Sequence, residues 1–387
     1  MALKAAPIWG CAIIPNSHVS SPYLGSRLFG FASKWDCCCV SVLAQRAITP
    51  LEEDQPHSPG IEFDSAGADS ETTMLHKDMI QLPKPLSAIH LSSSPDDGSK
   101  VRVAYQGIPG AFSESAALKA YPKCETVPCE RFEETFKAVE QCLVDKAVLP
   151  IENSVAGSIH RNYDLLLRHR LHIVGEVQLA VNHCLLGLPG VQMEDIKRVL
   201  SHPQAHAQCE TTLNNLGVVR VSADDTAGAA QIVASVGLKD TGAVASSRAA
   251  EIYGLDILAE NIQDDEDNVT RFLILSREPI IPGTGRLYRT SIVFTLEDGP
   301  GLLFKALAVF ALRGISLTKI ESRPQRKRSL RVVDDSNRGS AKYFDYLFYI
   351  DFQASMADPR SQNALGHLQE LATFLRVLGC YPIDLFF

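Results

Sequence analysis

One short stretch, residues 268–272 (NVTRF), combines side chains that could hold and polarise a small polar molecule. It follows an acidic turn and opens an apolar run that ends at Leu275, a pattern typical of a buried strand. Thr270 offers a hydroxyl donor, and Arg271 offers a planar, permanently charged guanidinium that suits carboxylates. Taken alone, these residues also fit a capped turn in which Arg271 pairs with the acidic run. The rest of the chain has to decide between the two interpretations.

Small polar residues also follow several other predicted strands, which we expect to end near residues 105, 150, 200, 221 and 245. Ligands of doubly wound α/β units bind outside the carboxyl ends of the strands. The residues at these ends are Ser113, Asn153, Ser154, Ser158, Ser201, Gln204, Gln208, Thr226 and Ser246. We therefore expect a cleft between two lobes that is lined by hydroxyls, amides and one guanidinium. The Ala/Gly-rich stretch 226–250 fits close helix packing as well.

The elements that must position these residues alternate between strand and helix. Residues 101–181 predict a β-α-β-α-β unit, with Ser113 as a possible cap of its first helix. A second α/β unit begins near Val191 and runs to residue 250. Pro203 near the first helical turn and Ser201 just before it are good signals for a helix start. Two such units predict a doubly wound α/β domain with two lobes.

The chain restarts as a third unit after Gly283. Strands are expected at 291–296, 316–321, 343–352 and around residue 381, and helices at 302–313 and 364–378. Leu375 is expected to face inward from the second of these helices. This β-α-β-β-α-β order is that of the ferredoxin-like fold.

Composition is ordinary for a globular protein, with 45% hydrophobic and 21% charged residues in 387. The net charge of −8 and the lack of a basic, aromatic-interleaved face give no reason to expect nucleic acid. The basic cluster at 326–331 is interpreted as a solvated hairpin loop. No apolar run reaches the length of about 18 residues that favours a membrane span, so no membrane partner is expected.

The first 35 residues contain no Asp or Glu but several Ser and a few basic residues. This pattern predicts an organelle transit peptide over residues 1–48, and the scarcity of Arg favours a plastid. A disordered tail without a targeting role is the alternative. Residues 49–100 are rich in Ser, Pro, Asp and Glu and are expected to form a disordered linker.

Neither the cysteines nor the histidines predict a metal site. Of the 10 cysteines, the six beyond the linker show no C-x-x-C spacing and are interpreted as reduced thiols. His202 and His206 are four residues apart, but no third ligand accompanies them. We therefore expect no metal and no cofactor.

At this point four ordered motifs resemble those of prephenate dehydratases. They are residues 107–113 (GIPGAFS), 150–154 (PIENS), 201–204 (SHPQ) and 268–272 (NVTRF). Residues 298–302 (DGPGL) and 320–324 (IESRP) resemble the phenylalanine-binding motifs of the attached ACT domain. With the acid-free N-terminus, the chain is most similar to plastid arogenate dehydratases. It departs from the family pattern at Ala156 and at Leu302, where bacterial members commonly have Ala.

The resemblance implies a two-lobed, periplasmic-binding-protein-like catalytic domain over residues 101–277 and an ACT regulatory domain over 289–384. The first lobe would comprise 101–185 with 262–277, and the second 186–261. The implied reaction is the decarboxylating dehydration of arogenate to phenylalanine, and of prephenate to phenylpyruvate, by a lyase of the chloroplast stroma. A non-catalytic amino-acid sensor or solute-binding protein is the alternative.

Roles carry over from the motifs to matching positions. The implied catalytic residues are Thr270, Asn153, Ser201 and Gln208, with Thr270 polarising the departing hydroxyl. The implied substrate-binding residues are Arg271, Phe272, Ser113, Ser154, Ser158, Gln204, Thr226 and Ser246. Phenylalanine as effector would contact Gly299, Gly301, Leu302, Glu321, Ser322 and Arg323. The family's ACT domains pair across subunits, which implies a homodimer or homotetramer.

Overall fold

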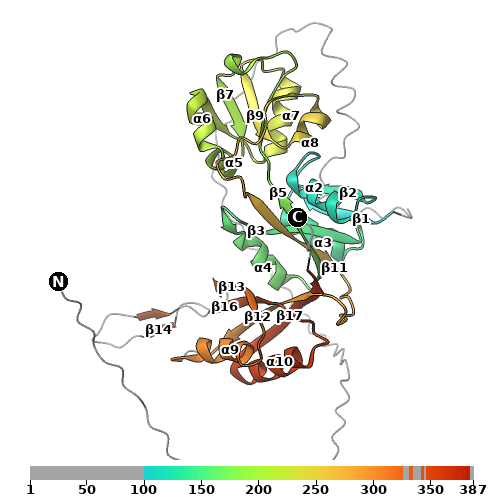
Figure 1. Cartoon of the computed structure of the whole chain (residues 1–387), viewed down its shortest axis with the longest axis vertical. Helices are drawn as coiled ribbons and strands as arrows, with labels where there is room; N and C mark the ends of the chain where they lie inside the picture. Colours follow the sequence, from blue (N-terminus) through green and yellow to red (C-terminus); the bar gives the residue numbers. More distant parts are fainter. Residues whose placement is uncertain (1–99, 298, 326–330, 334–340, 344–345, 384–387) are drawn as a thin grey trace, which may run out of the picture. The chain divides into compact units, whose positions relative to one another are not determined.

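The computed structural model describes residues 100–383 except 298, 326–330, 334–340 and 344–345 (Figure 1). The transit peptide and, apart from Lys100, the linker predicted for the N-terminal part lie outside the described residues, as do Asp298 and most of the basic cluster. Within the described residues, no helix is long and apolar enough to cross a membrane.

The first lobe is built on a mixed sheet in the strand order β5-β11-β3-β1-β2. Its strands are β1 (Arg102–Gln106), β2 (Glu125–Cys129), β3 (Lys146–Asn153), β5 (His172–Ala180) and β11 (Val269–Ser276), with β4 (Gly157–Ser158) paired to β3. Its helices are α2 (Phe112–Ala120), α3 (Phe132–Glu140) and α4 (His160–Arg168). β1, β2 and β3 are parallel, and β11 runs antiparallel to both of its neighbours. The strand β11, on which the chain returns from the second lobe, is therefore an interior strand between β5 and β3.

The second lobe has its own sheet in the order β10-β6-β9-β7-β8. Its strands are β6 (Cys184–Gly187), β7 (Arg198–Ser201), β8 (Val219–Ser222), β9 (Thr241–Ala245) and β10 (Asp256–Ala259). Its helices are η1 (Met193–Asp195), α5 (Pro203–Gln208), α6 (Glu210–Leu216), α7 (Thr226–Val236) and α8 (Ser247–Tyr253). The chain crosses between the sheets at 181–183 and 260–268, which makes two lobes as predicted. Cys184 already pairs in the second sheet, two residues before the predicted lobe boundary.

The C-terminal region has the predicted ferredoxin-like order. It consists of β12 (Tyr288–Leu296), α9 (Leu302–Ala311), β13 (Leu317–Pro324), β16 (Tyr346–Phe352), α10 (Pro359–Leu371) and β17 (Ala372–Pro382), with a hairpin of β14 (Arg331–Val333) and β15 (Ala341–Tyr343) before β16. The four main strands lie in the order β13-β16-β12-β17. Both helices pack on this sheet (Figure 1), where Phe310 of α9 and Leu368 of α10 share one apolar cluster with Phe294.

The predicted helix 364–378 is wrong in its second half. The helix α10 ends at Leu371, and residues 372–382 form the strand β17. Leu375, expected inward from a helix, instead pairs with Phe294 across the sheet. The apolar spacing of this segment fits both periods over a short window, and the ladder with β12 decides in favour of a strand.

One pair of strand residues joins the C-terminal sheet to the sheet of the first lobe. Gly379 of β17 pairs in parallel with Ile173 of β5, so that the two sheets form one continuous sheet. The approach is so close that a Cβ atom at Gly379 would overlap the carbonyl oxygen of Ile173. Glycine is therefore required here for space, not for backbone conformation.

We predict that Gly379→Ala lowers the free energy of unfolding by about 1–3 kcal/mol, because the strands must separate to admit one methyl group. Urea unfolding measures this. The control is Gly366→Ala on α10, where a Cβ atom meets nothing within 4 Å. This variant is expected to gain about 0.4–1 kcal/mol. Equal stability of both variants would contradict the close approach of β17 to β5.

Candidate active site

A cavity of about 500 Å³ lies between the two lobes. The first lobe contributes Gln106, Gly107, Ala111, Phe112, Ser113, Phe132, Pro150, Asn153, Ile159, Arg161, Thr270 and Phe272. Val181 and His183 come from one crossover, and the second lobe contributes His202, Gln204, Ala205, Gln208, Asp224, Asp225 and Thr226. Ligand cavities occur preferentially at such positions between lobes. This cavity therefore contains three of the four predicted catalytic residues: Asn153, Gln208 and Thr270.

Thr270 and Asn153 face each other across two antiparallel strands. Thr270 of β11 pairs directly with Asn153 at the end of β3. The Asn153 Nδ2 atom donates a hydrogen bond to Thr270 Oγ1 at 3.0 Å. Both side chains are buried. Since Thr270 Oγ1 already accepts a hydrogen bond from Asn153, its own O–H remains available to donate into the cavity.

Hydrogen bonds at both the oxygen and the nitrogen of the Asn153 amide fix its orientation. The backbone N–H groups of Val155 and Ala156 donate to its Oδ1 at 3.1 and 2.8 Å. Gln208 Nε2 donates to the same oxygen at 3.2 Å. On the other end, Asn153 Nδ2 also donates to Asn268 Oδ1 at 2.7 Å. Asn153 thereby connects the first lobe to the second through Gln208.

Ser201, the fourth predicted catalytic residue, lies outside the cavity lining. Its side chain is fully buried in β7. The hydroxyl donates to the carbonyl oxygen of Val244 in the neighbouring strand at 2.6 Å. Side chains of successive strand residues point to opposite faces, and the sequence motif contains no information on which face Ser201 occupies. The structure therefore gives this hydroxyl a role inside the sheet of the second lobe.

Of the predicted substrate-binding residues, Phe272, Ser113, Gln204 and Thr226 line the cavity. Ser154, Ser158 and Ser246 do not. Ser154 Oγ joins the ends of β3 and β11, since it donates to Asp267 O at 2.8 Å and accepts from Val269 N at 2.9 Å. Ser246 caps α8 and donates to Gly110 O at 2.6 Å. These hydroxyls satisfy the backbone at strand and helix ends, a role that sequence alone cannot separate from ligand binding.

Ser113 lies within α2 and does not cap it. The helix begins one residue after Ala111, which makes no side-chain cap. Instead, the Glu114 carboxylate reaches back and accepts from Gly110 N at 2.8 Å. Arg248 of the second lobe pairs with the same carboxylate at 2.8 Å. The predicted cap is therefore wrong, and a buried acidic side chain takes its place.

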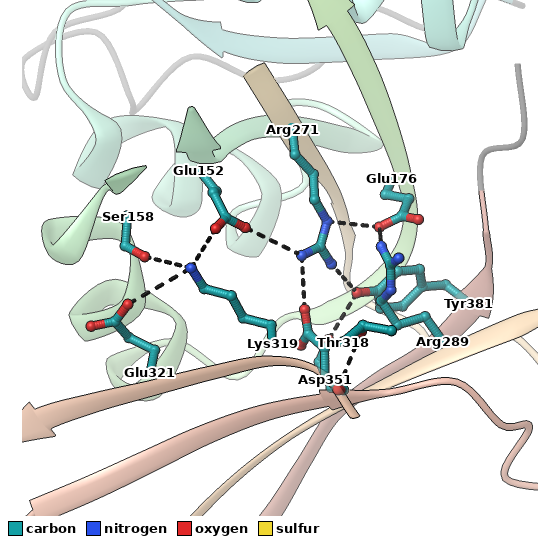
Figure 2. A network of polar contacts seen from close by, with 11 residues as sticks. Glu152, Ser158, Glu176, Arg271, Arg289, Thr318, Lys319, Glu321, Asp351 and Tyr381 are labelled. Carbon is teal, nitrogen blue, oxygen red and sulfur yellow. Dashed lines mark hydrogen bonds and ion pairs between the residues drawn. The ribbon is translucent and has the colours of Figure 1, made fainter. Parts of the chain in front are cut away.

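Arg271 is absent from the cavity lining. Its side chain reaches from β11 toward Glu176, Asp351 and Tyr381 (Figure 2). Its guanidinium contacts Glu176 of β5 at 2.8 Å and Asp351 of β16 at 2.8 Å. It also donates to the Tyr381 hydroxyl at 2.9 Å. Thr270 and Phe272 face the cavity, and the alternation of side chains along a strand places Arg271 on the other side. The prediction that Arg271 holds a substrate carboxylate is therefore at odds with this structure.

The charges around Arg271 compensate its burial. Burial alone disfavours the guanidinium, but Tyr381, Asp351 and Glu176 outweigh this effect and raise the pKa of Arg271 above its ordinary value. Glu176 is fully buried and pairs with a second arginine, Arg289 of β12. Removing Glu176, which both arginines share, would leave buried positive charge uncompensated and would be strongly destabilising.

A second ion-pair cluster lies beside the first (Figure 2). Glu152 pairs across the strands with Arg271, one position along from the Asn153–Thr270 pair. Lys319 of β13 contacts Glu152 at 2.5 Å and Ser158 at 2.7 Å. Glu321 extends the cluster to His160 at 3.2 Å. Ser158 therefore contacts the C-terminal domain, not the cavity.

The residues predicted to bind the effector lie on β13 and at the start of α9. Glu321 and Arg323 face the first lobe, where Arg323 pairs with Asp164 of α4 at 3.2 Å. Ser322 is exposed, and so are Gly299 and Gly301 at the start of α9, while Leu302 is half-buried. Gly301 adopts φ 75° as the residue before that helix, a conformation that favours glycine.

Several cavity residues were not predicted as site residues from the sequence, and three of them stand out. His183 and Arg161 lie in a crossover and on a helix with no recognisable motif, and Phe112 was counted only as part of a motif. Arg161 makes a bidentate pair with Glu133, at 2.8 Å to each carboxylate oxygen. His202 caps α5 by accepting from Gln204 N at 3.2 Å, and His206 contacts Val221 O at 3.0 Å. The two histidines thus have separate roles.

Comparisons with known proteins agree with this architecture. A family model described as prephenate dehydratase matches residues 103–280, and one described as ACT domain matches 290–341. Among curated proteins, arogenate dehydratase/prephenate dehydratase 1, chloroplastic, from Arabidopsis thaliana is 66% identical over 392 residues, covering 100% of both chains.

Among solved structures, prephenate dehydratase from Arthrobacter aurescens in complex with L-Phe is 31% identical, with a TM-score of 0.65, over 73% of this chain and 90% of its own. A chain described as the quorum-quenching acylase GqqA is 36% identical, with a TM-score of 0.65, over 73% of this chain and 98% of its own. The full-length similarity to the plant enzyme and the two domain matches together identify the family of this chain. The chain belongs to the prephenate dehydratase family, as a plant-type arogenate/prephenate dehydratase, a lyase with a C-terminal ACT domain.

Proposed function

We propose that the cavity between the lobes catalyses the decarboxylating dehydration of L-arogenate to L-phenylalanine, and of prephenate to phenylpyruvate, in the chloroplast stroma. The observation that carries this proposal is the buried Asn153–Thr270 pair, which leaves a hydroxyl donor at the cavity. Plant relatives named chloroplastic arogenate dehydratase support the substrate and the compartment.

The reaction needs little beyond a donor for the leaving group. The ring carboxylate leaves as CO2, its electron pair enters the ring, and the ring hydroxyl departs as the ring becomes aromatic. Hydroxide is a poor leaving group, so a hydrogen bond from Thr270 stabilises the developing charge, and solvent supplies the proton that completes the water molecule. Help of this kind is typically worth about 10²- to 10⁴-fold in rate. Asn153 and Gln208 hold this donor in place.

Both substrates carry two carboxylates, and the cavity has groups that attract anions. The first turns of α2 and α7 supply Ser113 and Thr226 to its lining, so the positive ends of these helix dipoles lie at the cavity. Arg161 adds a guanidinium. We propose that these groups take the role expected of Arg271, although Arg161 also pairs with Glu133 and the lining contains the carboxylates of Asp224 and Asp225.

A non-catalytic sensor and an acylase are the competing functions. Polar groups at strand ends would serve a sensor equally well, but a sensor would be free to lose the leaving-group donor that Thr270 supplies. The acylase relative shares 36% identity, whereas the plant relative shares 66% over the full chain. Since one fold hosts many functions, the more similar relative has the greater weight.

We predict that Thr270→Val lowers kcat for arogenate by about 10²- to 10⁴-fold, because the leaving group loses its donor. Thr270→Ser retains the hydroxyl and is expected to keep most of the activity. Steady-state formation of phenylalanine from arogenate measures both, and circular dichroism establishes that the variants are folded. Near-native turnover by folded Thr270→Val would rule out the assigned role.

Ser201→Ala is the matched comparison, since it also removes a buried hydroxyl from a predicted catalytic position. Its hydrogen bond lies within the second lobe's sheet. We therefore expect a loss of stability of about 1 kcal/mol with kcat changed much less than in Thr270→Val. A kcat loss as large as that of Thr270→Val, without loss of stability, would return Ser201 to the catalytic set.

Phenylalanine regulates the enzyme through the ACT domain, and we propose that the Arg271 cluster transmits its effect. Arg271 and Glu152 each adjoin a proposed catalytic residue in sequence, and both contact the ACT domain through Asp351 and Lys319. An effector acts only through its different affinity for two states. A movement of β16 or β13 in one state would act directly on the strands that carry Thr270 and Asn153.

Asp351→Asn tests this route. Coupling between sites is typically worth about 5- to 150-fold in affinity. We expect the variant to need at least about threefold more phenylalanine for half-maximal inhibition, with kcat in the absence of phenylalanine within about twofold of native. Asp240→Asn, which breaks an exposed pair with Arg198 in the second lobe, is the control. Unchanged inhibition of Asp351→Asn would exclude this cluster as the route.

We further propose that the protein is a homodimer or homotetramer that assembles through its ACT domains. Apolar side chains on and beside α9 support this, since Phe304 is 75% exposed and Leu312 is 83% exposed. Large apolar side chains exposed on and beside one helix are candidates for burial in an interface. Sedimentation analysis is expected to give a dimer or tetramer, and Phe304→Lys with Leu312→Lys to weaken it. A monomer at micromolar concentration would contradict the proposal.

A further inference from the structure

The chain of hydrogen bonds behind Thr270 extends further and ends on His183. This residue lies in the crossover between β5 and β6 and lines the cavity with a side chain that is only 2% exposed. Its backbone N–H donates to Gln263 Oε1 at 2.9 Å, and its carbonyl accepts from Ile262 N at 2.9 Å. Phe112 packs against its ring in a T-shaped contact, with centroids 5.4 Å apart. The second crossover and the first lobe thus hold the imidazole in place.

The direction of each hydrogen bond follows from the backbone. The N–H groups of Val155 and Ala156 can only donate, so the atom that they contact on Asn153 is the amide oxygen. Gln208 donates to this oxygen through Nε2. The remaining atom of the Gln208 amide, Oε1, therefore faces His183 Nε2 at 2.9 Å. No part of this assignment depends on a free choice of amide orientation.

The same logic fixes the state of the imidazole. Since Gln208 Oε1 can only accept, His183 Nε2 must carry a hydrogen. Burial lowers the pKa of His183, and the hydrogen bond with Gln208 opposes this effect only in part. The lowered pKa keeps the ring neutral near pH 7. Nδ1 has no hydrogen-bond partner among the residues that the structure describes. The single N–H of the neutral ring is therefore committed to Gln208.

We infer that His183 is a positioning residue for the dehydration, acting through Gln208 and Asn153 on Thr270. The inference rests on the role proposed above for Thr270. The donor on His183 stabilises the same orientation of the Gln208 amide that Asn153 requires, and this amide adds a third donor to the Asn153 oxygen. Asn153 then donates to Thr270 Oγ1, so the threonine hydrogen is directed to the leaving hydroxyl.

Removing the His183 N–H donor would disturb the hydrogen bonds that position Thr270. Gln208 is buried, with 9% exposed, and its oxygen would lose its partner. A reversed Gln208 amide would place its oxygen against Asn153 Oδ1, which already accepts two backbone hydrogen bonds. Two acceptors repel, so Asn153 would shift, and displacements of about 1 Å can lower rates by about 10²-fold.

The test compares three substitutions at His183 in the full-length protein. His183→Gln can place an amide N–H near the position of Nε2 and is expected to keep kcat within about threefold. His183→Asn, which places its amide near Nδ1, and His183→Leu are expected to lower kcat by about 10- to 100-fold. KM for arogenate should change less than about threefold, because the residue acts through Gln208. Native kcat in the Asn variant, or equal losses in Gln and Asn, would overturn the inference.

A double substitution separates this role from a structural one. If His183 acts through Gln208, then His183→Leu combined with Gln208→Ala has the kcat of Gln208→Ala alone. Losses that multiply would overturn the relay. Thermal unfolding checks that each variant folds, and if His183→Leu does not fold, His183→Asn replaces it in the pair.

The outcome is distinguishable from failure of the proposed function. If Thr270→Val keeps native turnover, the role of Thr270 is wrong and the relay has no target. If Thr270→Val is inactive while folded His183→Asn and His183→Leu turn over as fast as the native enzyme, the inference on His183 alone is wrong.

Discussion

The register between β11 and β3 is the constraint on which the active site depends. It sets Thr270 opposite Asn153 and, one position further, Arg271 opposite Glu152. Because successive side chains on a strand point to opposite faces, the first pair faces the cavity and the second faces the ACT domain. A slip of one residue would exchange these pairs and bury a guanidinium in the cavity. The same two strands therefore carry the proposed leaving-group donor and the contacts through which regulation can reach it.

A threonine at its ordinary acidity is a weak catalyst, and the structure compensates by orientation. Backbone N–H groups next to β3, the Gln208 amide of the second lobe and the His183 ring of the crossover all contribute to one arrangement of donors around Asn153. Groups that are held in place before the reaction need no reorganisation during it. Because Gln208 belongs to the second lobe and Asn153 to the first, this arrangement is complete only when the lobes are correctly placed.

On its other face, the first lobe is bound to the ACT domain by buried charge and by close backbone contact. Glu176 lies between Arg271 and Arg289, and Gly379 brings β17 against Ile173. A tightly packed interface of this kind changes between distinct packings and does not deform continuously. An effector that favours one arrangement of the ACT sheet would therefore favour one arrangement of the strands beneath Thr270.

The amino-acid order was sufficient to predict the two lobes, the ferredoxin-like unit and a cleft lined by Asn153, Gln208 and Thr270, because local hydrophobic periods and short motifs reflect which elements form. Long-range pairing decided the rest. Residues 372–382 became a strand because β12 was available as a partner. Arg271 turned from the cavity, and Ser201 and Ser246 were used by the backbone. His183 gained importance only because the crossovers bring it to Gln208. A linear pattern specifies residue types at a spacing, whereas the face that each side chain occupies depends on neighbours that are distant in the chain.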